Sequence, residues 1–426
     1  QQGQFIVERD VSRWPDGTVS GRYGFRHALY QEVLYQRLSA SRRVRFHQCI
    51  GEREAAGYGE HAAERAAELA MHFERGQQPQ QAITYYYRAA GVMVQRQAHQ
   101  EAIASLRRAL DLLYSFPDSL ARASQELSLQ VLLGVAFMAS KGLAAPEAEA
   151  AYARARTLCQ RLGDTPEIIP ALVRLLSFYT FRGELPLGAQ LADQVLHLVQ
   201  QRHDPESVLE AHLYKGIIEF LLGNWAAARR HCETVLSLYD ATTHHLHAFH
   251  YGLDPGIIAH SVLALLLWHL GYPAQALQRS QQALTFAAQY EHAPSAAIAL
   301  WLAIFLRAYQ REWAEVQRLA IAMRDLVSSQ GLMQWVGCDL YAQGWARAAV
   351  QHEEADLALM AQGLAAYREI GADLGTYNMQ VWLAEQYSLA GHFAEAQRLF
   401  SEMFALLSRT QEVAWSGDFF RLKGEM

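Results

Sequence analysis

A similar five-residue segment recurs about every forty residues through the second half of this chain. The third residue of each copy is position 183, 223, 271, 311, 351 or 391, so the steps are 40, 48, 40, 40 and 40. An apolar stretch with helical spacing lies before and after each copy. A fixed period of this length is typical of stacked helical hairpins, because one hairpin cannot bury its apolar faces alone. Such chains generally bind other molecules rather than catalyse reactions.

Composition excludes several other classes of protein. The 426 residues are 51% hydrophobic and 19% charged, with a net charge of −6 and no strongly basic stretch, so we expect no nucleic-acid partner. The four cysteines stand singly and far apart, which favours a reducing cytoplasm. No apolar run is long enough to span a bilayer, and we expect no membrane partner. The chain begins at Gln1 and stops within a helical pattern, which we interpret as a piece of a larger protein.

The pattern along the chain predicts two domains. Residues 4–11 and 19–25 alternate as strands around the Pro15-Asp16-Gly17 turn, which indicates a β-hairpin. From His27 onward the pattern is helical. We therefore predict a first domain over 1–58 and a domain of helical hairpins over 59–426. The predicted fold class is all-α: a right-handed superhelix of hairpins with a period of about 40 residues, preceded by a short β-hairpin.

Two columns of mostly small residues support this register. Small side chains let two antiparallel helices approach closely, so both columns should lie where the helices of each hairpin cross. Ile304 and Asp356 depart from the rule. Seven residues before each turn position stand Leu176, Gly216, Ala264, Ile304, Gly344 and Ala384. Five residues after it stand Gly188, Ala228, Ala276, Val316, Asp356 and Ala396.

These columns, with glycine at the turn and an aromatic residue close to it, resemble the tetratricopeptide repeat. That repeat is usually about 34 residues long, so units of 40 imply longer helices. The longer unit looks more like the helical-repeat sensor of the bacterial maltose-regulon activator type, over roughly residues 60–426. The resemblance implies signal transduction, transcriptional regulation, and a concave groove that binds a protein, a peptide or a small inducer.

The segment from Tyr23 to Tyr35, with Phe25-Arg-His-Ala-Leu29 opening a helix, resembles the end of the winged-helix domain in STAND signalling ATPases. In some bacterial proteins of that type the ATPase follows a nucleotide-cyclase domain. The resemblance implies that His27 faces bound ADP in the parent, although Ala28 stands where immune receptors have Asp. The alternative is that His27 only caps a helix.

This piece contains no GxxxxGK[ST] phosphate-binding loop and no catalytic constellation. We therefore expect it to be no enzyme and to hold no cofactor by itself. ATP or ADP, with Mg, would belong to the suspected parent ATPase, which we expect to contact this piece in cis.

The positions expected on the concave side of the hairpins are unusually aromatic. Such a wall suits a peptide, a ligand with apolar faces, or another copy of the chain, which would make a homo-oligomer. Packing between repeats explains the same pattern, so groove and core both stay open. The candidate partner-binding residues are Phe181, Phe220, Trp268, Trp301, Phe305, Tyr309, Tyr341 and Trp345.

Four histidines lie between His244 and His250, at the one longer step of the repeat. We expect a solvated linker there and no metal site, because no Cys or carboxylate stands at ligand spacing within the run. Two functions fit the sequence. One is a sensor arm of a STAND-type ATPase, and the other is a constitutive assembly scaffold without a ligand switch.

Overall fold

The computed structural model describes residues 6–425 except 142–144, 164–167, 203–204, 245–247, 249–252, 291 and 352. The chain divides into two compact units. One comprises Gln1–Ser140 with Ala150–Arg161, and the other comprises Lys141–Glu149 with Leu162–Met426. The sequence did not predict this division among the helices. The predicted end of a winged-helix domain at residue 58 stays a prediction.

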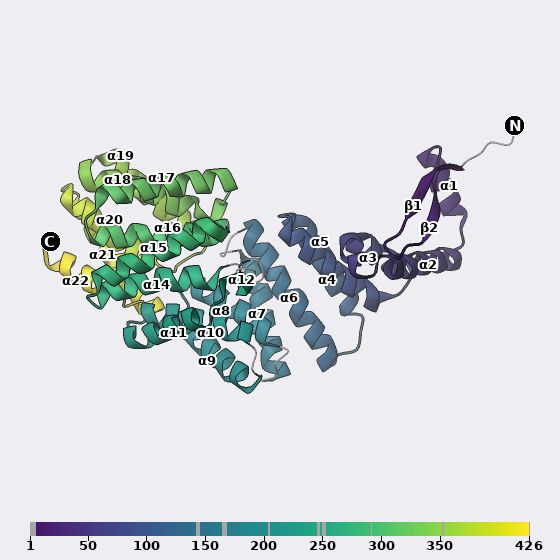
Figure 1. Ribbon diagram of the computed structural model, residues 1–426, viewed down its shortest axis with the longest axis horizontal. Coiled ribbons are helices and arrows are strands. Elements are labelled where there is room, and N and C mark those ends of the chain that lie inside the picture. Colours follow the sequence, from purple (N-terminus) through teal and green to yellow (C-terminus); the bar gives the residue numbers. More distant parts are fainter. Residues whose placement is uncertain are drawn as a thin grey trace. The chain divides into compact units, whose positions relative to one another are not determined.

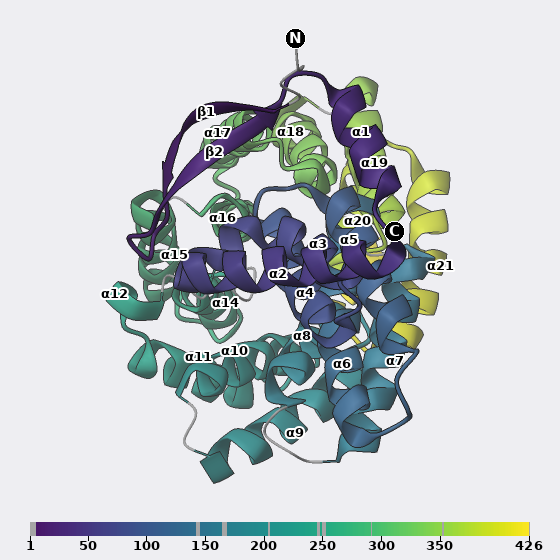
Figure 2. The same ribbon diagram turned by 90° about the vertical axis from the view of Figure 1, so that its right-hand side faces the viewer.

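The chain starts with an antiparallel β-hairpin and continues as paired helices (Figure 1). The tip of the hairpin reaches the carboxyl end of the second helix (Figure 2). There Asp16 N donates to Gly57 O at 3.2 Å, and Arg53 forms an ion pair with Asp16 at 2.9 Å. The elements are β1 (Ile6–Arg13), β2 (Val19–Phe25), α1 (Ala28–Arg37), α2 (Ala40–Tyr58), the 3-10 helix η1 (Gly59–Arg65), α3 (Ala66–Arg75), α4 (Pro79–Gln95), α5 (His99–Leu113), α6 (Leu120–Lys141) and α7 (Pro146–Leu162).

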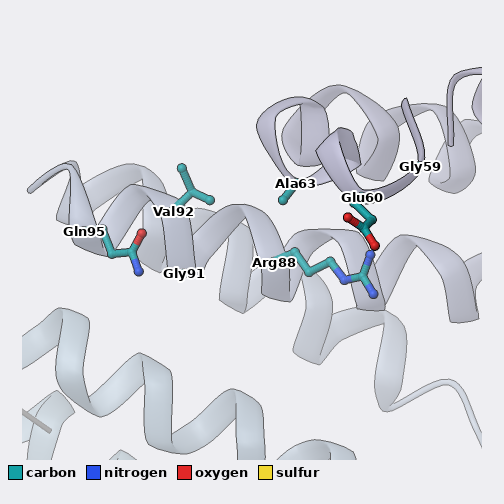
Figure 3. A pocket seen from close by; sticks show the side chains of 7 residues that line it. All are labelled: Gly59, Glu60, Ala63, Arg88, Gly91, Val92 and Gln95. Atoms are coloured by element: carbon teal, nitrogen blue, oxygen red, sulfur yellow. The ribbon is translucent and has the colours of Figure 1, made fainter. Parts of the chain in front are cut away.

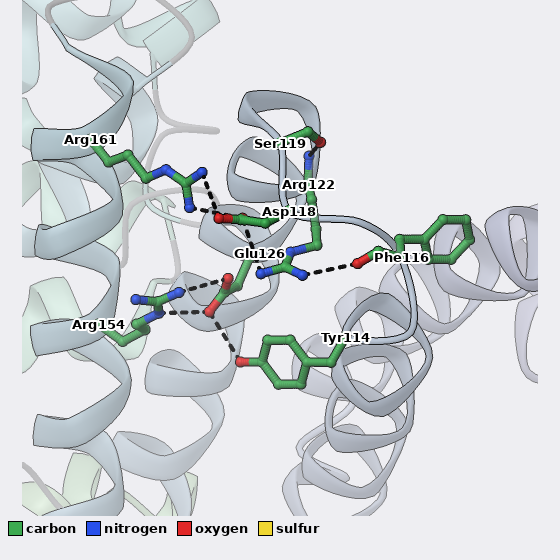
Figure 4. A network of polar contacts seen from close by, with 8 residues as sticks. All are labelled: Tyr114, Phe116, Asp118, Ser119, Arg122, Glu126, Arg154 and Arg161. Carbon is green, nitrogen blue, oxygen red and sulfur yellow. Dashed lines mark hydrogen bonds and ion pairs between the residues drawn. The ribbon is translucent and has the colours of Figure 1, made fainter.

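A polar network ties three helices of the first unit together (Figure 4). Glu126 on α6 is buried and accepts two hydrogen bonds from Arg154 on α7, at 2.7 and 2.9 Å. Tyr114 at the end of α5 donates to the same carboxylate at 3.0 Å. A bidentate arginine is a strong partner for a buried carboxylate, and it fixes the geometry of both groups. The network therefore fixes how α5, α6 and α7 pack.

The second unit consists of antiparallel helical hairpins. The elements are α8 (Ile169–Phe181), α9 (Leu185–Arg202), α10 (Pro205–Leu221), α11 (Trp225–Leu238), α12 (Ala241–His244), α14 (Pro255–His269), α15 (Pro273–Tyr290), α16 (Ala293–Tyr309), α17 (Trp313–Gln330), the 3-10 helix η3 (Met333–Trp335), α18 (Val336–Gln351), α19 (Glu354–Glu369), α20 (Thr376–Leu389), α21 (Phe393–Thr410) and α22 (Ser416–Glu425).

The predicted turns are confirmed at five of the six positions. Gly183, Gly223, Gly271 and Gly391 have φ between 71° and 84°, and Arg311 takes the same left-handed conformation at 59°. Glycine suits the end of a helix here because it lacks the Cβ that disfavours positive φ. At the sixth position, Gln351, the chain is still helical.

All twelve residues of the two columns are buried, as expected for positions where helices cross, and Gly188, Gly216 and Gly344 each lie close to a neighbouring helix. A Cβ on Gly344 would stand 2.6 Å from Asp356 O on the facing helix. Asp356, the exception in its column, is paired: Arg347 Nε donates to its Oδ1 at 2.6 Å. These contacts agree with the hairpin register predicted from the sequence.

In the second unit, the last hairpins along the chain contact the first ones through backbone hydrogen bonds. Asp373 N donates to Phe181 O at 3.2 Å, and Val413 N donates to Leu221 O at 2.8 Å. The separation along the sequence is the same in both pairs, so the same backbone contact repeats one hairpin later. The second unit thus turns back on itself, and residues 411–415 lie against the end of α10.

Candidate ligand-binding interior of the second unit

Aromatic side chains fill the interior of the second unit. The Trp345 ring is fully buried, and its centroid lies 4.8 Å from that of Trp382 and 5.5 Å from that of Phe305. Trp301 lies 4.7 Å from Phe305, also by ring centroids. Such distances are those of packed aromatic pairs. These side chains therefore belong to a core and do not form an open wall.

The eight predicted partner-binding residues all lie in this interior. Their contact with a partner stays a prediction, and it now requires the partner to reach a largely closed space. Five of the eight are buried, namely Phe220, Trp301, Phe305, Tyr341 and Trp345. The other three, Phe181, Trp268 and Tyr309, are half-buried.

Trp415, which the sequence analysis missed, lies at the centre of this interior. Its ring centroid is 5.3 Å from those of Phe220 and His269. Its Nε1 donates to Glu412 Oε1 at 2.7 Å. Trp415 follows the last predicted turn and falls in no repeat column, so periodicity gave no signal for it. The segment that carries it is held against the end of α10, because Val413 N and Ala414 N both donate to Leu221 O.

Helix α20 is buried from Thr376 to Gln386 and yet carries polar side chains. Glu385 is satisfied, because Arg311 donates to both of its oxygens at 2.7 and 3.2 Å. In contrast, Asn378 Oδ1 and both polar side-chain atoms of Gln386 are buried without a hydrogen-bond partner among the described residues. Each such atom costs about 1–3 kcal/mol relative to one that is hydrogen-bonded.

A cavity of about 120 Å³ lies within this interior. Its wall is mostly apolar and comes from α8, α10, α14, α16 and α20 together with Trp415. Four of the predicted partner-binding residues line it: Phe181, Phe220, Trp301 and Phe305. Asn378 lines it as well. The structure thus brings four of the eight predicted residues and Asn378 to one cavity.

Burial changes the protonation of two groups next to this cavity. It lowers the pKa of His269 to about 4, so the imidazole stays neutral near pH 7. It raises the pKa of Glu412 from its ordinary 4.5 to about 7, although hydrogen bonds from Trp415 and from the backbone of Gly375 lower it in part. Glu412 therefore titrates near neutral pH in the folded protein.

The raised pKa of Glu412 predicts a pH-dependent stability. Between pH 4.5 and about 7 the folded chain keeps a proton that the unfolded chain has lost, so the free energy of unfolding should fall as pH rises through this window. Glu412→Gln, which stays uncharged, should flatten that slope. Urea unfolding of both proteins at pH 4.5, 6 and 8 measures this. Equal slopes in the two proteins would contradict the prediction.

At the amino terminus the structure shows His27 as a helix cap. Its Nδ1 accepts a hydrogen bond from Leu29 N at 3.1 Å, and the residue is exposed. This is the geometry expected if His27 only caps the helix, which was the alternative to a position facing ADP. A position facing ADP in the parent stays a prediction.

The histidine run lies largely outside the described residues, which include His244 but neither His245, His247 nor His250. Over the described part of the chain, no group of three or more His, Cys, Asp or Glu side chains is placed to hold a metal ion.

No helix in that same part combines the length and apolarity needed to cross a membrane.

A second hollow, of about 620 Å³, lies in the first unit between η1 and α4 (Figure 3). Gly59, Ala63 and Gly91 are among the residues that line it, and the Glu60 and Arg88 side chains point toward one another at one end. Glu60 is exposed, as is Gln95 at the other end. Water competes for the polar groups in this groove, which makes it a weaker candidate than the interior of the second unit.

The first two helices expose apolar side chains one turn apart. On α1 these are Leu29 and Val33, and on α2 they are Phe46 and Ile50; each is at least 40% exposed. Helix α1 has no buried residue at all. Repeated apolar side chains on an exposed helix face are typical of a surface that another part of a protein covers.

The fold and the filled interior define a class of protein: a tetratricopeptide-like array of helical hairpins that follows a β-hairpin. The structure is similar to that of a Rap protein complexed with competence and sporulation factor, with a TM-score of 0.60, 10% identity and coverage of 88% of this chain and 98% of that one. It is also similar to the apo form of the quorum sensor NprR from B. thuringiensis, with a TM-score of 0.54, 12% identity and coverage of 82% and 98%. The predicted fold class is confirmed.

In sequence, the chain is 24% identical over 412 residues to an uncharacterised protein of Rhizobium meliloti (strain 1021). The match covers 95% of this chain and 40% of the relative, so the chain spans about two fifths of the length of that protein. No family model matches the chain.

Proposed function

We propose that this chain is the non-catalytic sensor arm of a longer cytoplasmic signalling protein, and that it binds a ligand inside the second unit. The observation that carries this proposal is the interior itself. It contains a cavity, buried polar atoms without a hydrogen-bond partner among the described residues, and the segment 411–415, which is held against the end of α10. Binding that displaces or tightens residues 411–415 would change the packing of two distant hairpins at once.

The exposed apolar face of α1 and α2 supports attachment to a preceding domain. We propose that this domain is a STAND-type ATPase and that it covers Leu29, Val33, Phe46 and Ile50 in cis. The match to only 40% of a longer relative supports the presence of further domains. In that parent His27 would face ADP, and the arm would bias the ATPase between its ADP and ATP states.

The filled interior also favours a second function. An array whose concave side is occupied by its own side chains suits a constitutive scaffold, which needs no ligand. The two functions differ in one respect: only a sensor passes a change in the interior to the ATPase.

We expect Trp415→Ala in the full-length protein to change the rate of ADP release several-fold. Leu106→Ala, which truncates a buried residue of the first unit, is the matched control for lost stability and should leave the rate unchanged. Release is measured with a fluorescent ADP analogue. An unaltered rate in Trp415→Ala would favour the scaffold, and a parent that holds no nucleotide would refute the ATPase assignment. The isolated chain should bind no ATP by calorimetry.

A further inference from the structure

We propose that the outer face of α2 binds an acidic surface with an apolar centre on another domain of the longer protein. This face consists of Arg42, Arg45, Phe46, Cys49 and Ile50, which stand three or four residues apart and so lie on one side of the helix. The inference rests on the proposed attachment to a longer protein, and it names the chemistry of the surface that covers this face.

The outer face of α2 is exposed, whereas the inner side of the helix packs on the array. Phe46 is 50% and Ile50 is 40% exposed, and Cys49 is exposed as well. On the inner side, His47 is buried and its Nδ1 lies 2.9 Å from that of His72 on α3. The described residues therefore hold α2 from within and leave its outer face uncovered.

This part of the chain carries positive charge without acidic residues close to it in sequence. Arg42 and Arg45 form no ion pair with a described residue, in contrast to Arg53, which lies 2.9 Å from Asp16. Their guanidinium groups are therefore available to a partner. Between Glu32 and Glu52 the sequence has no Asp or Glu and has four arginines, namely Arg37, Arg42, Arg43 and Arg45.

Arg42 does not suit the helix that carries it. Ser39 caps α2, and its Oγ accepts a hydrogen bond from Arg42 N at 3.4 Å. At the position of Arg42 in such a cap, Glu or Gln returns a hydrogen bond to the capping residue, and a negative charge also suits the positive end of the helix dipole. Arginine gains neither effect, which is typical of a residue that serves a contact outside its own helix.

The arrangement of the side chains on the outer face of α2 selects the partner. Phe46, Cys49 and Ile50 directly follow the two arginines, so a surface that covers the apolar side chains also covers guanidinium groups. Burying a charge without a partner is costly, and the covering surface therefore has to supply carboxylates. A nucleic-acid backbone would pair the arginines but place phosphates against Phe46 and Ile50, whereas protein interfaces combine arginine with aromatic and apolar side chains.

Cys49 reports directly on the outer face of α2, because its thiol is exposed and the other three cysteines of the chain are buried. Its labelling by N-ethylmaleimide, followed by mass spectrometry of the peptide that contains it, is compared between this chain and the full-length protein. We expect labelling to be about tenfold slower in the full-length protein, because a covered thiol reacts only from a minor open state.

Arg42→Glu and Arg45→Glu, each made singly in the full-length protein, should bring the labelling rate to within about threefold of that of the isolated chain, because they place like charges across the interface. Arg42→Glu also completes the cap of α2, so this variant is expected to fold, which circular dichroism checks. Arg96→Glu is the matched control. Arg96 is an exposed arginine of the same unit outside this face, and its reversal should leave the slow labelling unchanged.

Three results would overturn the proposal. The first is an equal labelling rate of Cys49 in the isolated chain and the full-length protein. The second is slow labelling that persists in both glutamate variants, which would mean a cover that does not depend on the arginines. The third is labelling of the isolated chain that slows with its own concentration, with duplex DNA or with phosphatidylserine vesicles, which would assign the face to a second copy, a nucleic acid or a membrane.

The outcomes for this face and for the proposed function are separable. Slow, arginine-dependent labelling of Cys49 in a full-length protein that holds no nucleotide supports the acidic partner surface and refutes the ATPase assignment. Equal labelling rates together with an ADP release rate that changes in Trp415→Ala refute the partner surface and support the sensor.

Discussion

Trp345→Ala is expected to lower the free energy of unfolding by about 4 kcal/mol, the usual cost of removing a large buried aromatic side chain. Trp345 is fully buried, and its ring packs against Phe305, Tyr341 and Trp382 from three other turns of helix. No neighbour can collapse into the space without breaking its own ring contacts. Urea unfolding followed by circular dichroism measures the loss.

Phe393→Ala is the control, because Phe393 is 59% exposed and its truncation should cost less than about 0.5 kcal/mol. A loss below about 1 kcal/mol in Trp345→Ala would mean that the aromatic column is not core and would restore the open groove. In that case the double variant Trp301→Ala with Trp345→Ala would keep its helical content and lose only partner binding.

Gly344→Leu should destabilise the chain by about 3 kcal/mol through overpacking. A Cβ at this position would stand 2.6 Å from Asp356 O and 2.8 Å from Met360 N, both of them backbone atoms. Backbone atoms of a packed helix cannot move aside as a flexible side chain would. Helices α18 and α19 must therefore separate before the larger residue fits.

Gly91→Leu provides the matched control for that substitution. Gly91 also lies inside a helix, and a Cβ there would meet no atom within 4 Å. Leucine should stabilise this position by about 0.5–1 kcal/mol, because glycine is a poor helix former. Thermal unfolding of both variants separates the effect of leucine on helix propensity from its steric effect where two helices cross. An unchanged melting temperature in Gly344→Leu would show that the hairpin register is wrong.

The hairpins could be predicted because each depends on residues that are close in sequence. Gly223 sets a turn through its own backbone conformation, and the pair of columns that contains Gly344 and Asp356 spans one hairpin. Both signals repeat along the chain with the same period and reinforce one another. The turns and the positions where helices cross followed from these signals.

The state of the concave side could not be predicted in the same way. An aromatic residue such as Trp301 gives the same pattern whether it faces a groove or a core. The choice depends on whether later hairpins return against earlier ones, which is set by small rotations between repeats summed over several hairpins. Trp415 and Asn378 acquire their positions from that return, and no local pattern marks either of them.

The backbone contacts between late and early hairpins also change how the second unit should come apart. In an open array each hairpin touches only its neighbours, so the ends fray first and the middle melts later. Here the backbone bonds from Asp373 to Phe181 and from Val413 to Leu221 couple the last hairpins to the first. Loss of either end therefore exposes the aromatic interior that every hairpin shares. Protection of the amides against hydrogen exchange should accordingly be lost in one cooperative step in this unit, without the graded protection along the chain that linear repeats show.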